Sequence, residues 1–271
     1  MMLRLWSLPA ICAGFFTLAA ATHPAAADDV VQMEFEGFGP AGLHVLTSHT
    51  VIEETPAWYQ IQGDVATAGL GAMFVNMANR SMTRGREVAD TPKPELFDSE
   101  TDRGGVAQHL RVDYRPDGTP NGSATPPPRE PVTPVSFSQL AGTVDNLTAY
   151  LLLERQVGRG GSCDLTVPVF DGRHRYDLQF SDAGHHILSP AEGQKFNGQT
   201  QACHMIRNKI AGFYVDKNHE EGTSSGTIWY AHLIPGDLAV PVRMSMETEI
   251  GTVALFLSKL HGRGVDLQLM D

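Results

Sequence analysis

The chain has 271 residues, with 20 basic and 31 acidic side chains and a net charge of −11 at pH 7. This excess of acid disfavours binding to nucleic acid or to an anionic membrane surface, because both kinds of partner attract clustered Lys and Arg. Hydrophobic residues form 42% and charged residues 19% of the chain, the proportions of an ordinary globular protein. We therefore expect a folded chain with a full core and no nucleic-acid partner.

Residues 1–27 have the three-part pattern of a cleavable secretory signal peptide. Arg4 supplies the positive start, residues 5–21 are apolar, and Ala25 and Ala27 form a cleavage site of small residues. The alternative, an uncleaved membrane anchor, needs about 20 apolar residues, which is more than this run supplies. We therefore expect export to the periplasm with cleavage after Ala27.

Cleavage after Ala27 would remove one basic residue, Arg4, and no acidic one, so the mature chain would carry a net charge of −12. No second long apolar run follows, and we expect no transmembrane segment after processing. We interpret residues 28–271 as a single β-rich domain.

Most of this domain alternates in hydropathy with a period of two. That period is typical of antiparallel strands with one face buried and one face in water. The clearest runs of one parity are Leu43, Val45, Thr47 and Val51; Tyr59, Ile61 and Val65; Val242, Met244 and Met246; and Val265, Leu267 and Leu269. Strands do not alternate regularly with helices, which argues against a doubly wound α/β sheet. The sequence predicts a mainly β fold with a curved antiparallel sheet.

Two segments interrupt the strand pattern. Residues 116–134 hold seven of the 17 prolines and are expected to form an exposed extended loop within the domain. Residues 146–156 have helical periodicity, and Asp145 before them is a suitable N-cap. Because this helix is strongly apolar, we expect it inside the concave face of the sheet. The predicted architecture is a half-open barrel or β-spiral wrapped around one internal α-helix.

Two cysteines, Cys163 and Cys203, remain after the expected processing. Two cysteines in an exported chain are most simply explained by a disulfide between them. Two free thiols are the alternative. Neither cysteine belongs to a C-x-x-C pair, so a metal site is disfavoured.

The most conspicuous motif is Phe170-Asp171-Gly172-Arg173. In a functional interpretation, Asp171 and Arg173 belong to a polar site. In a structural interpretation, Asp171-Gly172 is a hairpin turn between strands at 167–170 and 176–180. We favour the structural interpretation, in which Asp171, Gly172 and Arg173 form a turn motif.

This motif is part of an ordered set of segments that resembles an uncharacterised family of exported bacterial proteins, known as domain of unknown function 3108. The set includes Thr143-Val144-Asp145, Val169-Phe170-Asp171-Gly172-Arg173-His174-Arg175-Tyr176-Asp177-Leu178, Ala202-Cys203, Ile210-Ala211-Gly212-Phe213 and Pro241-Val242-Arg243. The resemblance implies a β-rich envelope protein and carries no catalytic residue or cofactor. By analogy of fold, it also suggests the curved sheets of periplasmic lipoprotein carriers.

The sequence lacks the usual signatures of site chemistry. It has no H-E-x-x-H, no G-x-S-x-G and no phosphate-binding loop. The acidic pairs Glu53-Glu54 and Glu220-Glu221 are interpreted as solvated turns. We expect no catalytic residue, no metal site and no cofactor.

These observations favour a non-catalytic periplasmic cell-envelope protein. We expect it to bind a lipid or another apolar ligand, or an envelope protein, in its concave sheet face. The residues expected to line that cleft are Leu147, Tyr150, Leu151, Met244 and Met246. Two alternatives stay open: a periplasmic hydrolase that acts on envelope polymer, and a structural envelope scaffold.

The signal-peptide interpretation predicts that the mature protein begins at Asp28. The measurement is the intact mass and N-terminal sequence of the protein recovered from the periplasm. Retention of the apolar segment 5–21 in that protein would contradict cleavage.

Overall fold

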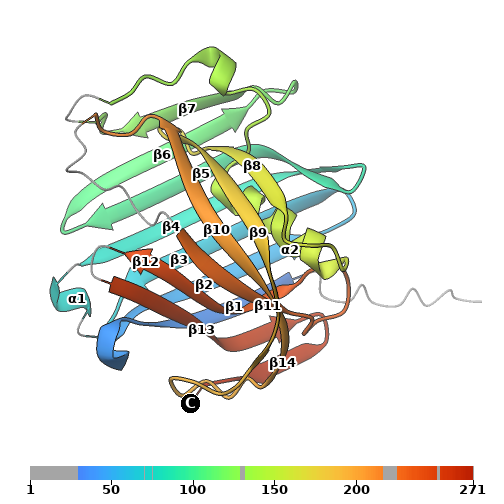
Figure 1. The fold of residues 1–271 in the computed structure, drawn as a ribbon. Helices are drawn as coiled ribbons and strands as arrows, with labels where there is room; N and C mark the ends of the chain where they lie inside the picture. The colour runs from blue at the N-terminus through green and yellow to red at the C-terminus, as the bar shows by residue number, and fades with distance from the viewer. Residues whose placement is uncertain are drawn as a thin grey trace, which may run out of the picture.

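The computed structural model describes residues 30–69, 71–74, 76–128, 132–215, 225–248 and 251–270. In these residues, 14 antiparallel strands form one continuous sheet that curves until it is nearly closed (Figure 1). The strands are β1 (Val30–Phe38), β2 (His44–Glu54), β3 (Trp58–Thr67), β4 (Met77–Val88), β5 (Thr91–Arg103), β6 (Val106–Tyr114), β7 (Pro120–Thr125), β8 (Leu165–Phe170), β9 (Arg175–Leu188), β10 (Gly198–Ala211), β11 (Ser225–Ala231), β12 (Val240–Thr248), β13 (Gly251–Gly262) and β14 (Val265–Gln268).

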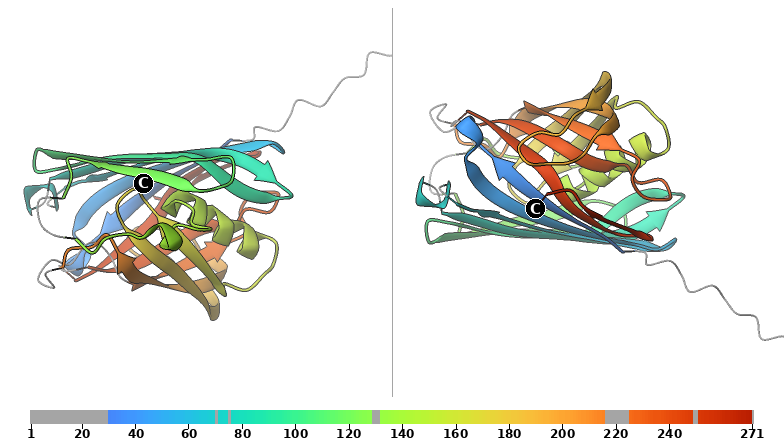
Figure 2. Two further views of the ribbon diagram at one scale, coloured as in Figure 1. Left: turned by 90° about the horizontal axis from the view of Figure 1, so that it is seen from above. Right: turned by 90° about the horizontal axis from the view of Figure 1, so that it is seen from below.

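The strand order is β7-β6-β5-β4-β3-β2-β1-β13-β12-β11-β10-β9-β8, with β14 paired to β13. Strands adjacent in sequence are therefore mostly adjacent in the sheet, and the pairing of β1 with β13 joins the two halves. Seen from above, the green strands β4–β7 form one layer, and the yellow and orange strands form another (Figure 2). The predicted mainly β fold with a curved antiparallel sheet is confirmed.

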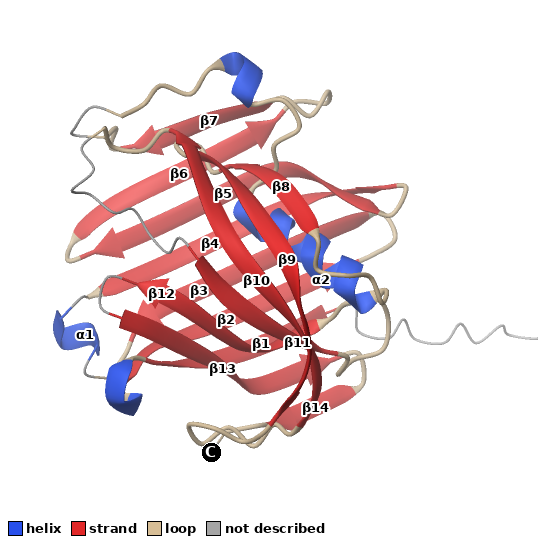
Figure 3. Ribbon diagram, in the orientation of Figure 1, coloured by secondary structure: helices blue, strands red, loops and turns tan. Residues whose placement is uncertain are grey.

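The predicted internal helix is α2 (Asn146–Gly158), which lies between the two layers of the curved sheet (Figures 2 and 3). A second helix, α1 (Gly71–Phe74), is a single turn at the ends of β3 and β4. Short 3-10 turns occur at Pro40–Gly42 and Phe137–Gln139.

The proline-rich segment differs from its prediction. Pro120–Thr125 forms β7, the edge strand that pairs antiparallel with β6, so this part of 116–134 is not a loop. Pro120 begins the strand, a position where its missing N–H costs no ladder hydrogen bond. Residues 129–131 lie outside the described residues.

The two edge strands approach each other through the Asp171-Gly172-Arg173 turn. Asp171 Oδ1 accepts hydrogen bonds from the backbone N–H groups of Arg173 and His174, so the turn joins β8 to β9 as a hairpin. Gly172 has φ of +101°, and a Cβ there would lie 2.9 Å from the carbonyl oxygens of Arg111 and Ser123. Glycine therefore allows the turn to sit directly against β6 and β7.

The start of α2 is fixed by a buried hydrogen-bond network. Asp145 caps the helix by accepting from the Thr148 N–H, at 2.9 Å, and also accepts from the hydroxyl of Thr83 in β4, at 2.9 Å. The Tyr59 hydroxyl in β3 is 2.9 Å from the Thr148 hydroxyl. Burial raises the pKa of Asp145 despite these hydrogen bonds. The predicted N-cap therefore also ties the helix to two strands.

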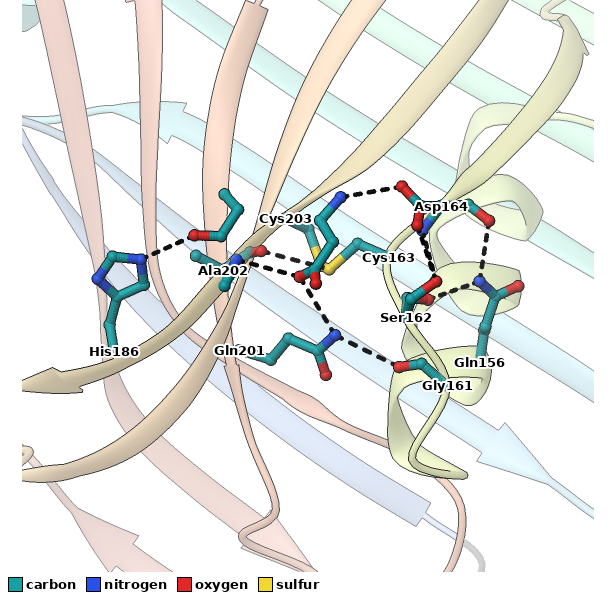
Figure 4. The surroundings of a disulfide bond; sticks show 12 residues. Gln156, Gly161, Ser162, Cys163, Asp164, His186, Gln201, Ala202 and Cys203 are labelled. Carbon is teal, nitrogen blue, oxygen red and sulfur yellow. Dashed lines mark hydrogen bonds between the residues drawn. A yellow bond between two sulfur atoms is a disulfide. The ribbon is translucent and has the colours of Figure 1, made fainter.

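The disulfide Cys163–Cys203 is present, with the two α-carbons 5.4 Å apart (Figure 4). Both cysteines are fully buried, and the bond links the segment after α2 to β10. Around it, Gln156 Nε2 donates to the Ser162 carbonyl at 2.6 Å. The disulfide thus holds the segment that follows α2 against β10.

The disulfide joins residues 40 positions apart. In the chain-entropy model, closing a loop of this length stabilises the fold by about 4 kcal/mol. We expect the double variant Cys163→Ala/Cys203→Ala to unfold at a clearly lower denaturant concentration than the oxidised wild type. Reductant should lower the wild-type midpoint and leave that of the double variant unchanged; equal midpoints for oxidised wild type and variant would contradict a stabilising bond.

Candidate functional site

The five residues predicted to line a cleft lie in the packed interior. Leu151 is fully buried in one core cluster, while Leu147 and Met246 pack against that cluster as partly buried residues. Met244 contacts this cluster and a second one, and Tyr150 packs against the second, edge-on to Phe180. Burial raises the pKa of Tyr150 to about 12. None of the five lines either of the hollows described below, and their role in ligand binding stays a prediction.

The first hollow, of about 310 Å³, lies beside the C-terminal half of α2 and contains a buried ion cluster. Arg155 donates to Glu54 of β2 through Nε, at 3.0 Å, and to both carboxylate oxygens of Glu87 of β4, at 2.8 and 2.9 Å. Arg263 forms a further ion pair with the other oxygen of Glu54. We call Glu54, Glu87, Arg155 and Arg263 the ion clamp.

The ion clamp corrects one sequence interpretation. Glu54 is buried and paired with two arginines, so the pair Glu53-Glu54 is not a solvated turn. Glu220-Glu221 lies outside the described residues. Two consecutive acidic residues do not by themselves indicate burial or exposure. The two arginines that neutralise the buried Glu54 carboxylate lie 101 and 209 positions away in the sequence.

Glu154, next to the ion clamp, carries a strongly shifted carboxyl. Burial, together with the charge of Glu54 and against the opposing charge of Arg155, raises the pKa of Glu154 to about 8. Its own backbone carbonyl accepts from the Ala239 N–H at 3.0 Å, which ties α2 to the segment before β12. The Glu154 side chain is therefore a buried carboxyl that keeps its proton near neutral pH, rather than a charged surface group.

The second hollow, of about 730 Å³, is open and lies along β2–β7. Thr83 of β4 points to α2, as its bond to Asp145 shows, and side chains along a strand alternate between faces. Arg80, three positions away, therefore points to the opposite face, where 79% of its side chain is exposed. Most residues that line this hollow share that outer face through the strand register.

A row of ionisable residues crosses the outer face at matched register, and we call it the charge row. From β13 to β6 its members are Lys259, Glu34, His49, Asp64, Arg80, Glu100 and His109. Acidic residues alternate with basic or protonatable ones at every step. Lys259 Nζ is 2.7 Å from Glu34 and Arg80 Nε is 2.8 Å from Asp64. Opposite charges on directly paired residues stabilise a sheet.

A second row runs beside the charge row, and we call it the floor row. Its members are Thr47, Ala66, Ala78, Asp102 and Ala107. Because three of the five side chains are alanine, this row forms the floor of the hollow, and the longer side chains of the charge row form one wall. The hollow is therefore a trough across the strands with a charged wall and a floor of mainly small side chains.

Sequence reasoning missed both rows. Each member is an ordinary surface residue on its own strand, and the charge row can be recognised only once six strand pairings are known. The sequence does show single ionisable residues at outward positions of successive strands. Without the strand register, this pattern looks the same as any solvent-exposed sheet face.

In the part of the chain that the structure describes, no three His, Cys, Asp or Glu side chains gather as metal ligands would. Within the same residues, no helix has the length and apolarity to span a membrane.

The fold and the disulfide define a barrel-like β protein with a helix packed inside it. By sequence, the chain belongs to the family described as protein of unknown function DUF3108, which matches residues 32–258. A comparison with curated proteins finds no match. Among solved structures, it is similar to a β-barrel-like protein of domain of unknown function DUF1849 from Brucella abortus, with a TM-score of 0.50 and 10% identity over 88% of this chain and 100% of that one. This likeness supports the fold alone.

The raised pKa of Glu154 predicts a dependence of stability on pH. The folded state holds a proton between the ordinary pKa of 4.5 and about 8, whereas the unfolded state has lost it. This carboxyl therefore favours the fold most below pH 4.5, and the benefit is lost as pH rises towards 8, by about 1.4 kcal/mol per pH unit.

We expect Glu154→Gln to lose less stability than wild type between pH 5 and pH 8, because the amide does not titrate. The measurement is urea unfolding at a series of pH values. Glu95→Gln, which changes an exposed carboxyl, should follow the wild-type slope. Parallel slopes for wild type and Glu154→Gln would contradict the buried, protonated carboxyl.

Proposed function

We propose that this protein is a non-catalytic cell-envelope component that works in the periplasm and binds a protein partner on the outer face of β2–β6. The observation that carries the proposal is the trough on that face, walled by the charge row. Alternating charges at fixed spacing fit the surface of a folded partner, because complementary potentials set orientation and exclude wrong partners.

Two independent features support the periplasmic location. Residues 1–27 have the charge and hydropathy pattern of a secretory signal peptide. The buried disulfide between Cys163 and Cys203 suits an oxidising compartment. Both features favour export without naming the envelope process that the protein serves.

The geometry favours a protein over an apolar ligand. The inner face of the sheet is packed against α2 and its core clusters, with Leu151, Leu153 and Leu257 fully buried. The trough on the outer face instead has the charge row along one wall, beside a floor that includes Ala66, Ala78 and Ala107. An apolar ligand there would strip water from Asp64, Arg80 and Glu100 without replacing its hydrogen bonds, which is unfavourable.

A structural scaffold is the second candidate. The filled interior favours it, because a barrel whose concavity is occupied by its own helix and core is built for rigidity. A hydrolase has no comparable observation in its favour among the described residues. The two candidates differ in one respect. In a structural scaffold, the charge row does not bind a partner.

Native mass spectrometry of the protein purified from its own periplasm tests the proposal. We expect a discrete protein adduct that is absent from Arg80→Glu, because the reversed charge repels the complementary surface. Arg159→Glu is the matched control: Arg159 forms an exposed pair with Asp237 at 2.7 Å, away from the trough, and its variant should keep the adduct.

Circular dichroism establishes that both variants fold. A bound lipid in place of a protein, or an adduct that Arg80→Glu leaves intact, would overturn the assignment of the binding face. No adduct in wild type would favour the scaffold.

A further inference from the structure

The charge row is self-complementary, and we propose that a second copy of this chain binds face to face on the trough. This inference rests on the proposed function, since it names the occupant of the same surface. It follows from the order of charges along the row and from the symmetry that a pair of identical chains obeys.

Most dimers of identical chains have a two-fold axis, which brings the same patch of each copy together. For two stacked sheet faces, that axis lies in the plane between them. An axis parallel to the strands and midway between β3 and β4 reverses the order of strands in the second copy. Each strand then faces a strand on the other side of the midpoint: β3 faces β4, β2 faces β5, and β1 faces β6.

With this axis, every ionisable contact of the charge row joins opposite types. Asp64 faces Arg80 of the second copy, and Arg80 faces its Asp64. Further out, His49 faces Glu100 and Glu34 faces His109. The alternation therefore places no two acids and no two bases together in this row.

Two other kinds of symmetric arrangement do not have this property. An axis perpendicular to the strands places each strand over itself, so Asp64 meets Asp64 and Arg80 meets Arg80. An axis along β3 or β4 also pairs like with like, because the row alternates with a period of two strands. The charge row thus selects one orientation of the second copy and requires the axis to lie midway between two adjacent strands. The position between β3 and β4 centres the contact on β1–β6.

The floor row and the size of the face suit this contact. Ala66 of one copy faces Ala78 of the other, so small side chains lie at the centre and let the sheets approach. The six strands β1–β6 lie about 4.8 Å apart, so this face is about 24 Å wide across the strands. A standard interface of ~800 Å² per partner is about 28 Å across, which is a similar width.

The test uses two single variants that repel themselves and attract each other. In Arg80→Glu, the reversed residue meets Asp64 of the second copy; in Asp64→Arg, it meets Arg80. We expect the dissociation constant of each homodimer to rise by about tenfold or more. In an equimolar mixture, Asp64 of the first variant meets Arg80 of the second, and the new Glu and Arg meet each other, so the dimer should return.

Analytical ultracentrifugation of the two variants, their mixture, wild type and Arg159→Glu provides the measurement. The pair Asp64–Arg80 within each chain is broken in both variants and stays broken in the mixture, so a recovery can come only from contact between chains. Wild type and Arg159→Glu should dimerise alike, and more weakly at high salt because exposed charges are screened.

A monomeric wild type, or a mixture that stays monomeric, overturns the second-copy assignment. If the periplasmic adduct in native mass spectrometry still depends on Arg80 but has the mass of another protein, the proposed function stands and only this inference fails. If no adduct depends on Arg80, both fail.

Discussion

The ion clamp between α2 and the sheet is the interaction on which the rest of the structure depends. Arg155 contacts Glu54 and Glu87 on strands that are not adjacent, and Arg263 reaches Glu54 from the turn between β13 and β14. Loss of one partner from such a buried cluster leaves an unpaired charge and costs about 3–5 kcal/mol. Together with Asp145 at the other end, the clamp sets the distance between helix and sheet along the full length of α2.

A helix fixed in this way decides where a partner can bind. It occupies the concave side of β2–β5, and the second half of the sheet folds over it, held by the disulfide between Cys163 and Cys203. The side chains of the inner face therefore pack into the core. The fold leaves the outer face available, and there the charge row lies beside the small side chains of the floor row.

The sequence predicted local structure well and long-range structure partly. The curved antiparallel sheet, the internal helix and the Asp145 cap follow from periodicity and capping, which are short-range properties. Strand β2 shows the limit: Val45, Thr47 and Val51 share one parity, but Ile52, of the other parity, is the residue buried in the core. Both faces of that strand carry β-branched residues, so hydropathy alone does not tell which one is inside.

The candidate site was less predictable for a related reason. A one-residue slip in register would dissolve the charge row and leave each strand's hydropathy pattern intact as a strand. The buried state of Glu54 likewise depends on partners 101 and 209 positions away. The ion clamp and the charge row both depend on contacts between segments that are distant in sequence. A single sequence without relatives does not reveal which segments are in contact.

The alternation in the charge row has a physical consequence that a row of one sign would lack. Within one chain, each ionisable residue has neighbours of the opposite type on the adjacent strands, and the ion pairs Lys259–Glu34 and Arg80–Asp64 stabilise the wide sheet. The same order repels a copy placed directly in register and attracts one displaced by a single strand, because displacement by one strand turns every like pair into an opposite pair. Stability of the exposed sheet and selectivity for one docked orientation thus arise from the same seven side chains.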